Sequence, residues 1–167
     1  MDLLAPPLTF AFSQDQRQRA RAEAFRRQAL NEQQRRKGRN NGAEEGDLAL
    51  RYHMLGAAGE MAVAVMLGME DKLYQETEAK RGSADLPPNI DIKTRSRHYY
   101  DLIVQLDESP DKILVLVTIQ NRITLIHGWI KAADAMREQW KKDPAGGRPA
   151  YFVPKTELLS LSLLKYK

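Results

Sequence analysis

The sequence has no cysteine, which excludes disulfide bonds and thiolate metal sites. No apolar run approaches the ~18–20 residues that a membrane-spanning helix needs. The amino-terminal residues also lack the charged region and long apolar core of a signal peptide. Glycine-rich phosphate loops and a hydrolase-like order of Ser, His and Asp are absent as well. These absences predict a soluble cytoplasmic protein with no membrane partner and no small-molecule cofactor.

The chain has 167 residues and 43% hydrophobic residues, which suits one domain with a substantial core. Its net charge of +4 is unevenly distributed. Residues 16–39 contain nine basic and two acidic residues, so this segment carries +7 and the rest of the chain carries −3. An anionic partner would therefore meet this segment first.

The basic segment has the features of a helix. Ser13 and Gln16 form a capping-box pattern, strong helix formers follow as far as Lys37, and Gly38 supplies a stop. The arginines suit phosphate oxygens, which predicts a DNA-binding helix. A solvated helix that packs by a thin apolar stripe, or that mediates self-association, explains the same pattern. The candidate DNA-binding residues of this helix are Arg17, Arg21, Arg26, Arg27, Arg35 and Arg36.

A loop rich in turn-forming residues follows, and it predicts a division of the chain. Residues 1–46 would form an arginine-rich helix with a hinge loop, and residues 47–167 would form the core domain. A second helix is expected from Asp47 to about Leu67. It contains two glycines, each costing about 1 kcal/mol relative to alanine, which indicates close approach of another segment. Glu60 lies among small apolar residues there, so its carboxylate must be paired, protonated or bound to a metal unless it faces solvent.

Residues 90–94 alternate apolar and polar side chains, the period of a half-buried strand. Asp91 and Lys93 then share the face opposite the core. A short proline-containing turn precedes this strand, so a hairpin can bring the carboxylate of Asp85 beside that of Asp91. Two converging carboxylates favour a hard divalent cation, because otherwise they repel and one stays protonated. Lys93 could then orient a water molecule or neutralise charge on a phosphate.

These residues resemble the catalytic motif of the PD-(D/E)xK nucleases, the restriction-endonuclease-like superfamily. Asp85 matches the first acid, and the triplet at residues 91–93 matches (D/E)xK. Two departures are present: Ala84 replaces the motif's proline, and the second acid is Asp rather than the commoner Glu. The Gly-Ala-Ala-Gly-Glu sequence at residues 56–60 resembles the Gly-x-x-Gly-Glu pattern of the first core helix, whose glutamate reaches the metal site in that superfamily. A solvated ion pair on an exposed strand would also produce an isolated Asp-x-Lys triplet.

The resemblance implies an α/β fold over residues 48–164 with the arginine-rich helix as an addition. The restriction-endonuclease-like core would consist of a helix, a three-strand antiparallel hairpin region, a crossover and further strands. The expected strands cover residues 72–79, 84–86, 89–96, 112–119, 122–129 and 151–153, with residues 102–106 left open between a strand and part of the crossover. The run 112–119 is typical of a strand covered on both faces. Helices are expected at residues 130–141 and from Pro154 through Leu161, after an irregular lead-in at residues 1–12.

The resemblance also implies a function and a site. The protein would be a Mg²⁺-dependent DNA endonuclease, with Mn²⁺ as a substitute ion, and a homodimer is expected because enzymes of this fold often work as dimers. The catalytic residues would be Glu60, Asp85, Asp91 and Lys93, with one or two metal ions held by the three acids and the carbonyl of Ile92. Arg95 shares the face of Asp91 and Lys93 and, with Arg97, would bind DNA. Two alternatives stay open: a non-catalytic DNA-binding or assembly protein on the same fold, and an RNA nuclease.

Overall fold

The structure is a computed structural model that describes residues 6–35, 47–75 and 83–164. Within these residues the helices are α1 (Gln14–Arg35), α2 (Asp47–Met66) and the single turn α3 (Ala132–Ala135). The strands are β1 (Leu8–Phe10), β2 (Ile90–Arg95), β3 (Leu102–Gln105), β4 (Ile113–Gln120), β5 (Ile123–Lys131), β6 (Lys141–Lys142) and β7 (Ala150–Val153). The predicted α/β class is confirmed. None of the described helices is both long and apolar enough to span a bilayer.

The strands form two sheets. The first has the order β1-β5-β4-β2, in which β2 and β4 run parallel and the other neighbours are antiparallel. The second has the order β3-β7-β6 and is antiparallel throughout. Adjacent parallel strands need a long connection. The segment between β2 and β4 provides this connection and contains β3, which belongs to the second sheet.

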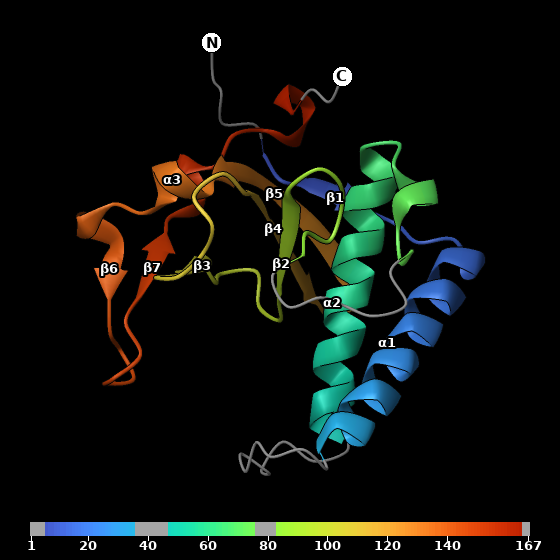
Figure 1. The fold of residues 1–167 in the computed structure, drawn as a ribbon. Coiled ribbons are helices and arrows are strands. Elements are labelled where there is room, and N and C mark those ends of the chain that lie inside the picture. The colour runs from blue at the N-terminus through green and yellow to red at the C-terminus, as the bar shows by residue number, and fades with distance from the viewer. Residues whose placement is uncertain (1–5, 36–46, 76–82, 165–167) are drawn as a thin grey trace.

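Strand β4 explains how the layers are stacked, because both of its faces are covered. Val115 and Val117 join the apolar cluster beneath α2, whereas Leu114 and Leu116 join the cluster of the second sheet. All four side chains are fully buried, as the unbroken apolar run predicted. Figure 1 shows α1 and α2 side by side on one side of the four-stranded sheet, with β3, β6 and β7 on the other side. The core is therefore a helix layer, a central sheet and a second sheet.

The arginine-rich helix is part of this core. Its amino terminus has the predicted capping box: the backbone N–H of Ser13 donates to Gln16 Oε1 at 2.9 Å, and the backbone N–H of Gln16 donates to Ser13 Oγ at 3.1 Å. Ala20 and Ala24 are buried in the same apolar cluster as α2. The predicted helix end and hinge at residues 36–46 lie outside the described residues. Helix α1 thus packs along α2 and contributes to the core that α2 covers.

The predicted close approach at the α2 glycines is confirmed at one of them. A Cβ atom on Gly59 would lie 1.8 Å from Thr94 Oγ1 of β2, whereas a Cβ atom on Gly56 would lie 3.8 Å from its nearest neighbour, Arg27 Nη1. The first distance is far inside van der Waals contact and the second is ordinary contact. Gly59 therefore sets how closely α2 lies against β2.

Two predicted helices near the carboxyl terminus are wrong. Residues 130–141 do not form a helix, because β5 continues to Lys131 with Ile130 paired to Leu114. The single turn α3, a 3₁₀ turn at Glu138–Trp140 and the start of β6 follow. The segment from Pro154 forms 3₁₀ turns at Lys155–Glu157 and Leu161–Leu163. Between these turns the backbone of Leu159 exchanges two hydrogen bonds with Trp129 of β5, at 2.8 and 2.9 Å. Pairing with β5 thus replaces the backbone hydrogen bonds of the expected helix.

Three predictions nearer the amino terminus also need correction. Lys72 lies in a 3₁₀ turn at Glu70–Lys72 rather than in a strand, and residues 76–79 lie outside the described residues. Residues 84–86 contribute only an isolated bridge between Leu86 and Ile90. Conversely, the lead-in expected to be irregular contains β1, which pairs with β5. Of the ambiguous residues 102–106, Leu102–Gln105 form strand β3.

Candidate active site

Strand β2 places the predicted triplet at the centre of a charged cluster. Asp91 is buried, and its Oδ2 atom accepts a hydrogen bond from Lys112 Nζ at 2.7 Å. Lys93 Nζ lies 3.5 Å from the same oxygen. The other oxygen, Asp91 Oδ1, is buried and accepts no hydrogen bond from the described residues. Asp91 therefore has one carboxylate oxygen held by two ammonium groups and one that lacks a partner among those residues.

Glu108 and Lys112 complete this cluster, and sequence reasoning missed both. Glu108 lies 3.0 Å from Lys93 Nζ and 3.3 Å from Lys112 Nζ, and its side chain is only 10% exposed. Burial raises the pKa of Glu108, but the hydrogen bonds and charges of the two lysines outweigh burial and lower it. An acid and a base four residues apart face each other on a helix, but residues 106–112 form turns, so the sequence carried no signal for this pair.

Asp85 approaches the cluster through the predicted tight connection. The backbone groups of Leu86 and Ile90 exchange two hydrogen bonds of 3.0 Å, and Asp85 Oδ2 accepts the backbone N–H of Ile92 at 2.7 Å. Burial, followed by the negative charge of Glu60, raises the pKa of Asp85 to about 7, and the charge of Asp91 adds to this. The hydrogen bond from Ile92 and the charge of Lys93 oppose the shift. The three predicted acids thus lie within electrostatic range of one another.

Glu60 of α2 is held by an arginine from α1. It is buried, and both of its oxygens accept hydrogen bonds from Arg27: Nη1 donates to Oε1 at 2.9 Å and Nη2 donates to Oε2 at 2.7 Å. This is the parallel two-bond geometry in which a guanidinium binds a carboxylate most strongly. The expectation that a carboxylate in this setting must have a partner is confirmed. Among the described residues, that partner is Arg27.

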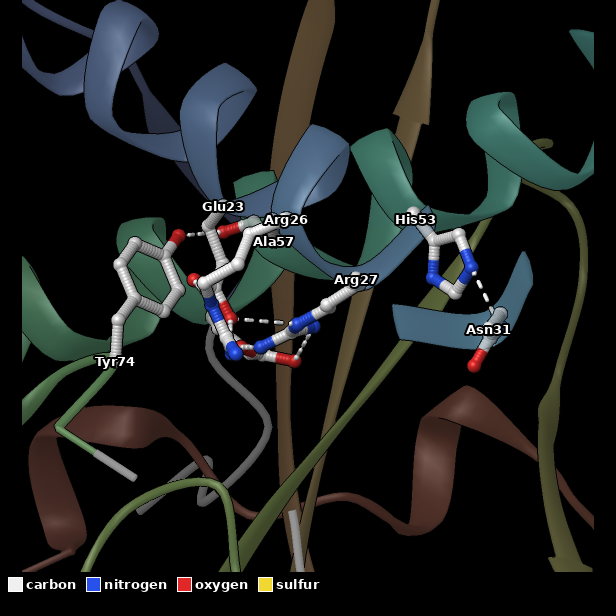
Figure 2. A network of polar contacts seen from close by, with 8 residues as sticks. Glu23, Arg26, Arg27, Asn31, His53, Ala57 and Tyr74 are labelled. Atoms are coloured by element: carbon white, nitrogen blue, oxygen red, sulfur yellow. Dashed lines mark hydrogen bonds and ion pairs between the residues drawn. The ribbon is translucent and has the colours of Figure 1, made fainter. Parts of the chain in front are cut away.

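Glu23 anchors the same arginine from within α1. Arg27 Nε donates to Glu23 Oε1 at 2.9 Å, and Arg26 donates to both oxygens of Glu23 at 2.6 and 2.7 Å. Figure 2 shows Arg27 reaching from α1 into this network, with the ring of Tyr74 on one side. Glu23 occupies the buried stripe that Ala20 and Ala24 begin, so its burial was readable from helical spacing.

Arg27 and Glu60 shift the pKa of each other in the direction that favours their charged forms. Burial lowers the pKa of Arg27, but its hydrogen bonds and charge interactions with Glu60 and Glu23 outweigh burial and raise it above its ordinary value. Burial raises the pKa of Glu60, and the two hydrogen bonds and charge of Arg27 oppose this shift without cancelling it. Arg27 is therefore the main group that stabilises the ionised form of Glu60.

The carboxylates of Glu60, Asp85 and Asp91 are ligands of the kind that a hard divalent cation binds, but their positions suit such an ion only in part. Carboxylate oxygens are the ligands that Mg²⁺ prefers. Asp91 has a buried oxygen without a partner among the described residues. The negative charges of Glu60 and Asp91 help to raise the pKa of Asp85, and a bound cation would reduce this repulsion. As they stand, however, no three acidic or imidazole groups among the described residues are grouped closely enough to hold a metal ion. Two of the acids are already paired: Arg27 binds both oxygens of Glu60, and Lys112 binds Asp91 Oδ2.

The predicted DNA-binding arginines fall into separate groups. Arg17 and Arg21 of α1 are exposed, whereas Arg26 and Arg27 turn toward Glu23. Arg95 is half-buried, stacks over the ring of Tyr100 at 4.2 Å and donates to the carbonyl of Asp101. The exposed Arg97 lies just beyond β2. The side chain of Arg35 and all of Arg36 lie outside the described residues.

The raised pKa of Asp85 predicts how the free energy of unfolding changes with pH. The native state holds a proton that the unfolded chain releases at lower pH, so stability falls as pH rises from about 4 to about 7. An asparagine side chain at this position would still accept the Ile92 N–H but would carry no charge. Without divalent cations, we expect Asp85→Asn to raise the free energy of unfolding at pH 8 by about 2–4 kcal/mol, and to change it little at pH 4. Urea unfolding in EDTA at both pH values measures this.

Glu108→Gln is the matched control, because the pKa of Glu108 is shifted downward. Its ionised form stabilises the native state above its ordinary pKa, and that contribution disappears as pH falls. Glu108→Gln is therefore expected to destabilise the protein at pH 8, the opposite of Asp85→Asn. A loss of stability at pH 8 in both variants would contradict the buried, mutually repelling carboxylates described above.

Comparison with known proteins provides no relative: no protein-family model, curated protein or solved structure matches this chain.

Proposed function

We propose that the protein is a divalent-metal-dependent nuclease of the PD-(D/E)xK type that hydrolyses phosphodiester bonds in DNA. One arrangement carries the proposal: the buried Asp91 has an oxygen without a partner among the described residues, Lys93 Nζ lies 3.5 Å from its other oxygen, and Asp85 is bonded to the backbone of the intervening Ile92. Burial and the charges of Glu60 and Asp91 raise the pKa of Asp85 there. A stabilising core does not need three interacting acids, because burying like charges together opposes folding. Such an arrangement is expected where a cation and an anionic substrate bind.

Each residue has a distinct role in the proposed reaction. Asp85 and Asp91, with the carbonyl of Ile92, would hold Mg²⁺, and Glu60 would join them once its oxygens are released. The ion, when bound, would polarise the phosphate and lower the pKa of an attacking water molecule. Lys93 would orient that water and offset the negative charge that develops on the phosphate oxygens. Glu108, 3.0 Å from Lys93 Nζ, would keep the ammonium in place.

A second candidate function has its own supporting observation. Glu60 is already paired with Arg27, and Asp91 is already paired with Lys112, so the acids do not need a metal for neutralisation. A DNA-binding or assembly protein that does not cut would retain such pairs, with the exposed Arg17 and Arg21 contacting the phosphate backbone. Because α1 contributes to the core, deleting it would confound the comparison. An Arg17→Gln/Arg21→Gln variant tests the helix without uncovering α2.

The decisive experiment incubates the purified protein with plasmid, linear and branched DNA in Mg²⁺, Mn²⁺ or EDTA. The proposal requires cleavage that depends on the divalent cation and stops in EDTA. The Arg17→Gln/Arg21→Gln variant is then expected to bind DNA more weakly and to cut at high DNA concentration. Salt-sensitive binding without cleavage under any condition would instead support the non-catalytic function. RNA of matched sequence identifies the preferred nucleic acid.

A further inference from the structure

The contact between Arg27 and Glu60 gives α1 a role in the chemistry of the site. Arg27 uses three of its nitrogens, two on Glu60 and one on Glu23, and it spans from α1 to α2. A guanidinium that binds both oxygens of a carboxylate leaves little room for a divalent cation on them, and the two positive groups repel. Arg27 therefore opposes the binding of a cation to Glu60 while it holds both oxygens.

A phosphodiester offers Arg27 an alternative partner of the same geometry. Its two non-bridging oxygens accept the paired hydrogen bonds that a carboxylate accepts. The Arg27 side chain is 28% exposed, so it reaches the surface, whereas the side chain of Glu60 is only 8% exposed. The exposed Arg17 and Arg21 lie on the same helix and would attract a nucleic-acid backbone toward it.

Glu23 would keep the movement of the Arg27 side chain small during such an exchange. Arg27 Nε is bonded to Glu23, and Glu23 is held on both oxygens by Arg26. Glu23 therefore offers Arg27 an acceptor beside Glu60, which would keep the guanidinium near this place when its outer nitrogens leave Glu60 for a phosphate. Helix α1 need not unfold or separate from α2, to which the hydrogen bond between Asn31 and His53 also joins it (Figure 2).

We propose that Arg27 is exchanged between Glu60 and a phosphodiester of the substrate, so that binding of the nucleic-acid backbone frees Glu60 for the divalent cation. The inference rests on the proposed function, because it assigns Glu60 to the cation. Its consequence is reciprocal: the nucleic acid strengthens cation binding, and the cation strengthens nucleic-acid binding by the same factor. Arg27 is thus a positioning residue that makes the cation site dependent on substrate.

The test measures Mn²⁺ binding to the full chain by electron paramagnetic resonance, without nucleic acid and without any turnover. Arg27→Gln is expected to bind Mn²⁺ about tenfold more tightly than the wild type, a typical size for coupling between sites. Arg21→Gln, a substitution on the same helix at an exposed arginine, is expected to bind as the wild type does. Arg27→Gln/Glu60→Gln is expected to lose the gain, because the gain requires the Glu60 carboxylate. Equal Mn²⁺ affinity in Arg27→Gln and the wild type overturns the exchange.

A second measurement keeps the proposal testable if Arg27→Gln does not fold. In Lys93→Ala protein, expected not to cut, Mn²⁺ affinity is measured with and without a saturating short DNA duplex. The exchange predicts about tenfold tighter binding with the duplex, and adding Arg27→Lys should reduce this gain because an ammonium cannot form the paired bonds. No gain with the duplex overturns the exchange. Failure of every protein to bind Mn²⁺ overturns the proposed function too, whereas metal-dependent cleavage without coupling overturns the exchange alone.

Discussion

Asp91→Asn is expected to lower Mg²⁺-dependent DNA cleavage by at least about a thousandfold while leaving the protein folded. Asparagine keeps the shape of the side chain but removes the negative charge that would hold the cation. The amide carbonyl can take the place of Asp91 Oδ2, so the ammonium groups of Lys112 and Lys93 keep an oxygen acceptor. Ile90 and Ile92 remain packed beneath α2, so β2 should remain in place.

Lys93→Ala is expected to cause a loss of similar size for a different reason, because it removes the ammonium that would orient the water. Cleavage of plasmid DNA under single-turnover conditions measures both variants, and circular dichroism establishes that they are folded. Asp71→Asn is the control, since this carboxylate lies on the surface with a side chain that is 73% exposed. Wild-type cutting by clean preparations of Asp91→Asn or Lys93→Ala would end the assignment of this site.

Gly59→Ala is expected to lower the free energy of unfolding by about 3 kcal/mol, the cost of forcing an extra carbon into a filled space. The new Cβ would lie 1.8 Å from Thr94 Oγ1 and 3.0 Å from Thr94 Cβ. Threonine is branched at Cβ and has few rotamers, so it cannot move aside easily. Either α2 shifts away from β2 or Thr94 leaves its position. A shift of α2 would also move Glu60 away from Asp91 of β2, so cation binding should then weaken as well.

Gly56→Ala is the matched control earlier on the same helix. Its Cβ would meet only Arg27 Nη1, at 3.8 Å, which is ordinary contact. Removing a glycine from the middle of a helix is expected to stabilise the protein by up to about 1 kcal/mol. Urea unfolding of the two variants measures the difference. Equal stability of Gly56→Ala and Gly59→Ala would show that α2 does not lie against Thr94 as described.

Local pattern predicted much of the scaffold. The capping box located the start of α1, and the apolar run at residues 112–119 identified a strand covered on both faces. Alternation identified β2 and the face that Asp91 and Lys93 share. The same reasoning failed at residues 130–141 and after Pro154, where helix-forming residues lie next to β5. There, pairing of Ile130 with Leu114 and of Leu159 with Trp129 overrides helix propensity.

Gly128 shows how this override depends on tertiary contact. Its φ of +140° and its missing side chain allow the backbone of Leu159 to approach, since a Cβ there would lie 2.4 Å from the Leu159 carbonyl oxygen. The sequence shows the glycine, but it does not show that the segment around Leu159, far along the chain, packs against it.

For the candidate site, the sequence by itself determined which acids are available and that Asp85, Asp91 and Lys93 lie near one another, because that arrangement follows from strand alternation and one tight connection. It also required Glu60 to have a partner, because an ionised carboxylate among small apolar residues is costly. Only the tertiary structure decided which positively charged side chain pairs with each acid. Arg27 pairs with Glu60, and Lys112, which also contacts Glu108, pairs with Asp91. Charge interactions depend on distance in space and not on distance along the chain. The pairing of these side chains therefore depends on the packing of α1 on α2 and of β4 beside β2.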